Sequence, residues 1–207
     1  KGVYFIMITL AFGQMAFFFM VSLSAYGGDD GLTLPARSTL LGQPILASNI
    51  AFYYLCLAIL AGFFLFSRAM IGARFGRVLR GIRDNSDRMR AIGFAPFRYQ
   101  LAAYCIAGGM AGIAGALLAN QAEFVAPAYM SWQRSGELII MVVLGGIGTL
   151  TGPVLGAVAF ILLEEALARL SEHWKFALGF CLILIVLFTR GGLMGGLRRL
   201  SEGARHG

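Results

Sequence analysis

Charged residues are scarce in this sequence. Asp, Glu, Lys and Arg make up 13% of its 207 residues, whereas hydrophobic residues make up 58%. A soluble domain usually contains about a quarter charged residues. Apolar runs long enough to cross about 30 Å of hydrocarbon recur along the chain. The composition therefore predicts an all-α polytopic membrane protein with about six apolar helical segments, forming one transmembrane domain over residues 1–207.

Motifs of enzymatic chemistry are also missing. The chain has no Gly-x-x-x-x-Gly-Lys-Ser/Thr phosphate loop, no His-Glu-x-x-His and no Gly-x-Ser-x-Gly. ATP hydrolysis, zinc-protease and serine-hydrolase activity are therefore not expected of this chain. Its histidines, His173 and His206, have no evident catalytic partner. Cys56, Cys105 and Cys181 lie in apolar runs at no metal-ligand spacing, so we expect buried thiols, no disulfide, no metal and no cofactor.

The few charges are unevenly placed. Asp, Lys and Arg are nearly missing from the apolar runs, which argues against proton coupling or voltage sensing. The net charge of +7 comes from arginines beside these runs, where a Lys/Arg excess sets membrane orientation. The basic character therefore points to a lipid bilayer and not to a nucleic-acid partner.

The longest polar segment runs from Arg74 to Arg98. Its apolar residues recur at spacings of three, four and seven and so fall on one helical face: Phe75, Val78, Leu79, Ile82, Met89 and Ile92. Gly93 suits a helix end, and Pro96 discourages continuation. The pattern predicts one amphipathic helix over residues 74–93. Such a helix either docks on a partner or is a basic juxtamembrane helix that only sets topology.

The first three spans are expected over residues 3–24, 45–66 and 99–119. By the positive-inside rule, residues 68–98 and the tail 190–207 are cytoplasmic, and residues 25–44 lie outside. The outer segment is either an external loop or irregular backbone near a translocation route. A second outer loop over residues 120–136 holds three aromatics that suit the membrane interface: Phe124, Tyr129 and Trp132.

A glycine-rich block interrupts the apolar pattern farther along the chain. The apolar piece Glu137–Leu144 is short, GGIGTLTGP follows over residues 145–153, and apolar character then resumes. This pattern predicts a broken helix or tight intramembrane turn, which in transporters often lies near the substrate route, or a simple loop. The rest of the chain is expected to cross either three times or once beside a re-entrant pair, with the last span over residues 176–189. Glu165 and Arg169 are expected to form a surface ion pair.

Several stretches together resemble the permease subunit of a branched-chain amino acid ABC importer (LivM-type). They are GRVLRGIRDNSDRMRAIGFAPFRYQLAAYCIAGGMAGIAGALLA, SGELIIMVVLGGIGTLTGPVLGA and LFTRGGLMG, with the opening KGVYFIMITLAFGQM and the loop YGGDDGL. The resemblance covers nearly all of the chain. Members of that family are normally longer at the N-terminus, and this chain begins with Lys1, so we expect an N-terminally incomplete permease.

The resemblance implies a transport mechanism. A periplasmic binding protein would deliver substrate to a heterodimer with a second permease subunit in the bacterial inner membrane, and two cytoplasmic ATPase subunits would drive it. The segment 74–93 matches the family's coupling helix by position. The expected coupling residues are Arg77, Arg80, Arg83, Asp84, Asn85, Asp87, Arg88 and Gly93. Residues expected near the path are Gln14, Gly145, Gly146, Gly148, Gly152 and Pro153.

Other functions fit parts of the same pattern. A related ABC importer for urea, short amides or other amino acids would share these motifs. A non-catalytic membrane scaffold or a membrane enzyme would need polar groups gathered within the spans. A secondary transporter would need carboxylates at mid-membrane. The sequence shows neither feature.

Overall fold

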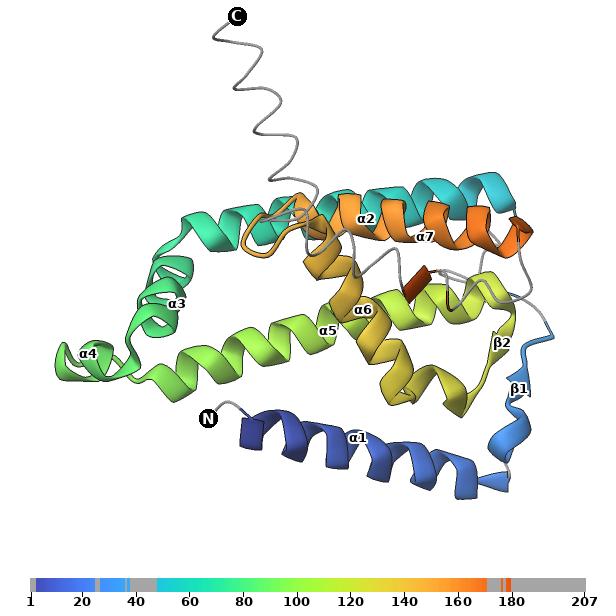
Figure 1. Ribbon diagram of the computed structural model, residues 1–207, viewed down its shortest axis with the longest axis horizontal. Helices are drawn as coiled ribbons and strands as arrows, with labels where there is room; N and C mark the ends of the chain where they lie inside the picture. The colour runs from blue at the N-terminus through green and yellow to red at the C-terminus, as the bar shows by residue number, and fades with distance from the viewer. Residues whose placement is uncertain are drawn as a thin grey trace, which may run out of the picture. The chain divides into compact units, whose positions relative to one another are not determined.

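The computed structural model describes residues 3–24, 27–35, 37, 48–170, 176 and 178–179. These residues form mainly α-helices (Figure 1): α1 (Val3–Ser22), α2 (Asn49–Gly72), α3 (Arg74–Asp84), α4 (Ser86–Ala91), α5 (Pro96–Ala122), α6 (Trp132–Gly145) and α7 (Gly152–Leu170). The connections hold the short helices η2 (Gly28–Asp30) and η4 (Pro127–Met130) and the two-residue strands β1 (Leu32–Thr33) and β2 (Phe124–Val125). The helical fold is as predicted, whereas the antiparallel pairing of β1 with β2 was not anticipated.

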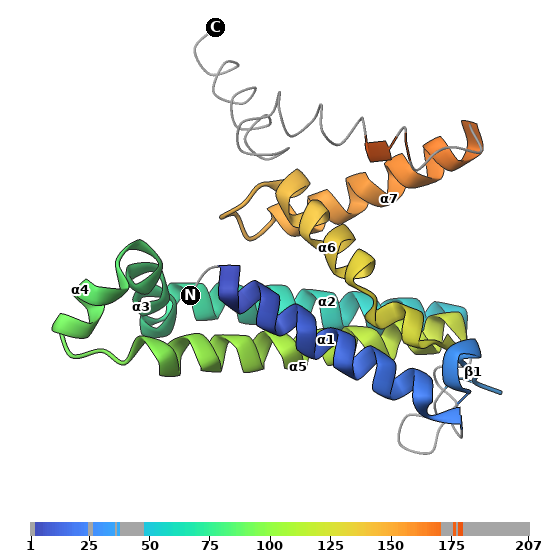
Figure 2. The ribbon, with the colours of Figure 1, turned by 60° about the horizontal axis from the view of Figure 1, so that its bottom comes forward.

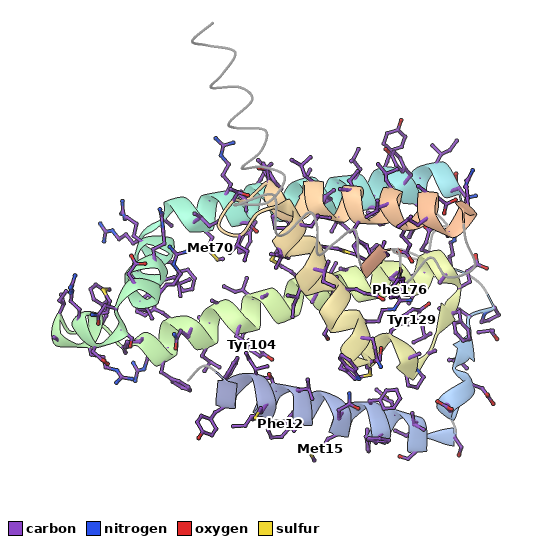
Figure 3. The ribbon with its side chains drawn as sticks, in the orientation of Figure 1. Phe12, Met15, Met70, Tyr104, Tyr129 and Phe176 are labelled. Carbon is purple, nitrogen blue, oxygen red and sulfur yellow. The ribbon has the colours of Figure 1, made fainter. Side chains whose placement is uncertain are left out.

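Three helices in the described part of the chain are long and apolar enough to cross a membrane: Tyr4–Ser22 within α1, α2 and α5. At 1.5 Å per residue, the 24 residues of α2 extend about 36 Å. Their large apolar side chains are exposed, as in Figure 3, where Phe12 and Met15 project from α1 and Tyr104 projects from α5. This surface is suited to lipid. The last predicted span, 176–189, falls outside the described residues except for residues 176, 178 and 179, and the tail 190–207 falls wholly outside them.

The chain divides into two compact units, one made of Lys1–Met20 and Ala128–Gly207 and the other of Val21–Pro127. In the second unit, α3 contacts both α2 and α5. Figures 1 and 2 show α3 and α4 at one end of α2 and α5, with β1 and β2 at the other end. The placement of all 207 residues in one transmembrane domain stays a prediction.

In the first unit, α6 and α7 form an antiparallel hairpin. Gly145 lies against Gly152, and Gly156 lies against Met141. Leu144 and Phe160 form the buried core of the hairpin, exposed by 2% and 3%. The 14 residues of α6 extend about 21 Å, less than the hydrocarbon thickness of about 30 Å. Because α6 ends at Gly145 and α7 begins at Gly152, the break predicted near residues 145–153 is present.

Some sequence predictions require correction. Cys56 is half-buried and Cys105 is exposed, so the prediction of buried thiols is wrong for these two residues. The predicted outer loop 120–136 is shorter, because α5 continues to Ala122 and α6 already begins at Trp132. The amphipathic segment 74–93 is not one helix, because Asn85 separates α3 from α4.

Candidate functional site at α3 and α4

A tight elbow joins α2 to α3. Ala73 is extended (φ −71°, ψ 173°), and its N–H donates to the Ala69 carbonyl at 3.0 Å. The buried Gly76 then lies against the end of α2, where a Cβ would stand 2.5 Å from the Ile71 oxygen and 2.6 Å from its Cα. Only glycine permits this approach, so the sequence holds α3 directly against the last turn of α2.

The Arg80 side chain ties the same elbow together. Its Nη2 donates to the Ile71 carbonyl at 2.8 Å, and its Nε donates to the Gly76 carbonyl at 3.4 Å. A cation at a helix C-terminus is favourable because the last carbonyls lack helical partners. Arg80 is also one of the predicted coupling residues; its guanidinium contacts the end of α2, and its contact with an ATPase stays a prediction.

Asn85 explains why the predicted single helix is divided. Its backbone is extended (φ −156°, ψ 102°), and its side-chain oxygen accepts from the N–H groups of Asp87 at 3.1 Å and Arg88 at 2.9 Å. Asparagine is among the preferred N-cap residues because this contact satisfies amides that have no helical partner. Asn85 therefore ends α3 and starts α4.

Replacing Asn85 by alanine is expected to loosen α4 selectively. Loss of an N-cap costs about 1 kcal/mol, and α4 has only six residues. Amide hydrogen exchange over Ser86–Ala91 should accelerate about fivefold, while exchange in α3 stays unchanged. Asn85→Asp is the matched control because aspartate caps as well as asparagine. Equal exchange in Asn85→Ala and the wild type would contradict this role.

Contacts within the second unit hold α4 on α3 and hold both helices against α5. A Cβ on Gly81 would lie 2.8 Å from Met89 Sδ, so α4 packs closely on α3. Tyr99 of α5 contacts the rings of Phe75 and Phe94, at centroid distances of 5.7 and 6.1 Å. Gly93 has φ +94°, a conformation that favours glycine, and it allows the chain to turn back toward α5.

Charged side chains of α3 and α4 also remain exposed. Five of them are predicted coupling residues that make no contact with α2 described above, and they are called here the outward surface: Arg77, Arg83, Asp84, Asp87 and Arg88. The ion pair Arg83–Asp84 measures 3.6 Å with both side chains 73% exposed. Exposed pairs of this kind contribute about 0–1 kcal/mol. The Arg83–Asp84 pair therefore adds little to the stability of the chain. The eight predicted coupling residues thus separate into this surface and three that shape it, Arg80, Asn85 and Gly93.

The glycine block at residues 145–153 serves the α6–α7 turn. Gly146 and Gly148 have φ values of +116° and +93°, which favour glycine. The Thr149 hydroxyl accepts from the Gly152 N–H at 3.1 Å and donates to the Gly146 carbonyl at 3.1 Å. The residue after Gly152 is Pro153, which suits the first turn of a helix because it lacks an N–H.

The expected path residues are not assembled into a substrate site by these contacts. Gln14 lies in the middle of α1 and is partly exposed. The glycines of the block close a turn, and Gly145 and Gly152 also carry the helix contact. Their part in a translocation path stays a prediction. The predicted pair Glu165–Arg169 is confirmed at 2.7 Å.

Sequence reasoning missed a second polar cluster, at the opposite end of α2 and α5. There Arg37 contacts Asn49 at the start of α2 and Glu123 at the end of α5. One signal could have found it. Arg37 is the single basic residue in the predicted outer segment 25–44, where the positive-inside rule disfavours arginine.

Comparison with known proteins agrees with this architecture. The profile of the family described as "Branched-chain amino acid transport system / permease component" matches residues 1–187. The chain belongs to this family. It is therefore a multi-pass membrane permease component and not an enzyme, and the resemblance found in its motifs is confirmed.

The individual proteins to which the chain is similar share fewer than a third of its residues. The permease is 25% identical over its whole length to the high-affinity branched-chain amino acid permease protein LivM of Escherichia coli K12, of which it covers 55%. It is 26% identical over 76% of its length to the probable LivM protein of Methanocaldococcus jannaschii, covering 46% of that protein. It is also 29% identical over 93% of its length to the autoinducer 2 import permease LsrC of Salmonella paratyphi B, covering 57% of it.

The permease spans about half the length of the curated relatives it matches. No solved structure matches it.

Proposed function

We propose that this chain is the transmembrane permease subunit of an ABC importer and that the outward surface of α3 and α4 docks on a separate ATPase subunit. The observation that carries the proposal is that some residues of this segment attach it to the membrane spans, whereas others are exposed to a partner. Arg80, Gly76 and Tyr99 hold α3 on α2 and α5, whereas the five charged side chains of the outward surface are exposed. A helix fixed to two spans on one side and open to a partner on the other can transmit movement.

The arrangement suits a transporter with two states. ATP binding on a partner would displace α3, and the elbow at Gly76 and Arg80 would pass this displacement to α2. By the positive-inside rule, α3 and α4 face the cytoplasm and the β1–β2 end faces outward. A periplasmic binding protein and a second permease subunit, most simply in a heterodimer, complete the assembly in the inner membrane.

Branched-chain amino acids are the proposed substrates. The family description and the LivM relatives support this class. The broken segment at residues 145–153 is the proposed lining of the path, because backbone groups at a helix break can bind the charged ends of an amino acid. The LsrC relative favours a second candidate, an importer of a small polar solute such as autoinducer 2. Urea, short amides and other amino acids stay as alternatives within the same mechanism.

Substrate-stimulated ATP hydrolysis tests this function. This chain would be co-expressed with a second permease subunit, ATPase subunits and a binding protein, and the complex would be reconstituted in vesicles. Leucine, isoleucine or valine should raise ATP hydrolysis severalfold when the binding protein is present. Stimulation only by autoinducer 2, urea or an amide would keep the mechanism and change the substrate. If ATP hydrolysis by the assembled complex is raised by no loaded binding protein, the importer function is contradicted and a scaffold is favoured.

A further inference from the structure

The end of α2 and α5 opposite α3 is held by one arginine. Arg37 Nε lies 3.3 Å from Glu123 Oε1, and Arg37 Nη1 donates to Asn49 Oδ1 at 2.7 Å. The guanidinium carbon also lies 5.2 Å from the centroid of the Phe52 ring, which is 4% exposed. These four residues are called here the Arg37 cluster. They join the outer segment, the first turn of α2 and the end of α5.

Backbone contacts reinforce the cluster. The Leu34 N–H donates to the Glu123 carbonyl at 2.8 Å, and β1 pairs with β2 directly after α5. The Arg37 side chain is only 14% exposed, whereas Glu123 is 52% exposed, so one partner of the pair is shielded and the other faces the surface. Both side chains of every other ion pair in the described part of the chain are at least 38% exposed.

Glu123 occupies an unfavourable backbone position. Its φ of +52° and ψ of +24° are left-handed, and among the described residues it is the one non-glycine with positive φ. Glycine is the usual residue after the last turn of a helix, because a Cβ is strained in this conformation. The backbone of Glu123 is therefore strained. Glycine would relieve the strain but could not form the ion pair with Arg37 that the Glu123 carboxylate forms.

We propose that Arg37 is a positioning residue for transport: together with Glu123 it keeps the outer ends of α2 and α5 joined throughout the transport cycle. Because α3 contacts α2 and α5 at their other ends, the two spans are then connected at both ends. A displacement applied at α3 moves them together instead of spreading them apart. The transport consequence rests on the proposed function, whereas the connection itself does not.

Glu123→Gly separates this role from stability. Glycine relieves the left-handed strain and keeps the backbone pairing, but it removes the carboxylate. Uptake by the assembled transporter should fall about tenfold, and Arg37→Gln should have the same effect. The control is Arg169→Gln, which removes an ion pair of 2.7 Å whose side chains are 78% and 63% exposed. It should leave uptake within about twofold of wild type. Wild-type uptake in both Glu123→Gly and Arg37→Gln would overturn the proposal.

Chemical rescue provides a sharper test. In a background with Cys56, Cys105 and Cys181 replaced by serine, Arg37→Cys and Glu123→Cys would be combined and joined with a short bifunctional thiol reagent. Uptake should be low before cross-linking and recover after it, because the connection is restored without the original side chains. Continued inactivity after complete cross-linking would overturn the proposal, since the ends would then have to separate during transport.

A distance measurement keeps this inference separate from the proposed function. Nitroxide labels would be placed at Ile50 and Leu118, which are 71% and 49% exposed, in the permease in lipid nanodiscs without any ATPase. Glu123→Gly should broaden the distance distribution relative to the unsubstituted permease. Equal widths would overturn the connection even if the transporter works, and a narrow wild-type distribution would support it even if no substrate is transported.

Discussion

Reversing the charge of Arg83 is expected to lower substrate-stimulated ATP hydrolysis by about tenfold or more. Removal of one partner of a buried interface ion pair typically costs about 2–5 kcal/mol, and 1.4 kcal/mol already corresponds to tenfold, so a loss of this size is expected where the ATPase covers Arg83. The Arg83 side chain is 73% exposed, and its contact within the chain is a weak pair with Asp84 at 3.6 Å. Stability of the permease should therefore change little in Arg83→Glu. The measurement is ATP hydrolysis by the reconstituted complex with and without loaded binding protein.

Arg98→Glu is the matched control for Arg83→Glu. Arg98 is also exposed and belongs to the same basic segment, but it lies in the first turn of α5 and outside the outward surface. It should retain stimulation within about twofold of the wild type. Equal loss in both variants would show that net charge near the membrane matters and not the outward surface. Full stimulation in Arg83→Glu would contradict its assignment to that surface.

Replacing Gly156 by alanine is expected to disrupt the α6–α7 hairpin. A Cβ at this position would collide with the Met141 carbonyl and lie 2.7 Å from the Gly145 nitrogen. Backbone atoms cannot move aside as the end of a flexible side chain can, so α6 and α7 must separate. Overpacking of this kind costs on the order of 3 kcal/mol. The fraction of permease recovered as a monodisperse species in mild detergent should fall severalfold.

Gly136→Ala tests whether this effect is specific to the hairpin contact. Gly136 lies on α6, the other helix of the same hairpin, and a Cβ there meets nothing within 4 Å. Alanine is also the better helix former, by about 1 kcal/mol in a helix interior. Gly136→Ala should therefore be recovered as well as the wild type. Full recovery of Gly156→Ala would show that α6 and α7 do not pack through these glycines.

The membrane spans could be predicted because their signal lies in composition. The apolar runs of α1, α2 and α5 are continuous, so hydropathy locates them, although the predicted second span began four residues early and ended six residues early, at Phe66 instead of Gly72. The break at residues 145–153 was also predictable, because glycine and proline interrupt helices locally. In each case the residues that determine the structure lie within one continuous segment of the sequence.

The site was harder to predict because its details depend on tertiary contacts. The helical spacing of apolar residues continues past Asn85, since Met89 still packs on α3 after the chain has broken and turned. The Asn-Ser-Asp sequence at that point was a visible N-cap signal. Nothing local distinguishes Arg80 from Arg77. The difference arises because Gly76 brings the Ile71 carbonyl within reach of Arg80.

Site-specific photo-cross-linking tests the central claim most directly, that the outward surface meets the ATPase. A photoreactive amino acid would replace Asp87, whose side chain is 83% exposed, in the assembled transporter. The same substitution at Ile139 of α6, which is 64% exposed, would serve as the control. We predict a cross-link to the ATPase subunit from position 87 and none from position 139. No ATPase product from position 87, or equal products from both positions, would contradict the assignment of α3 and α4 as the coupling site.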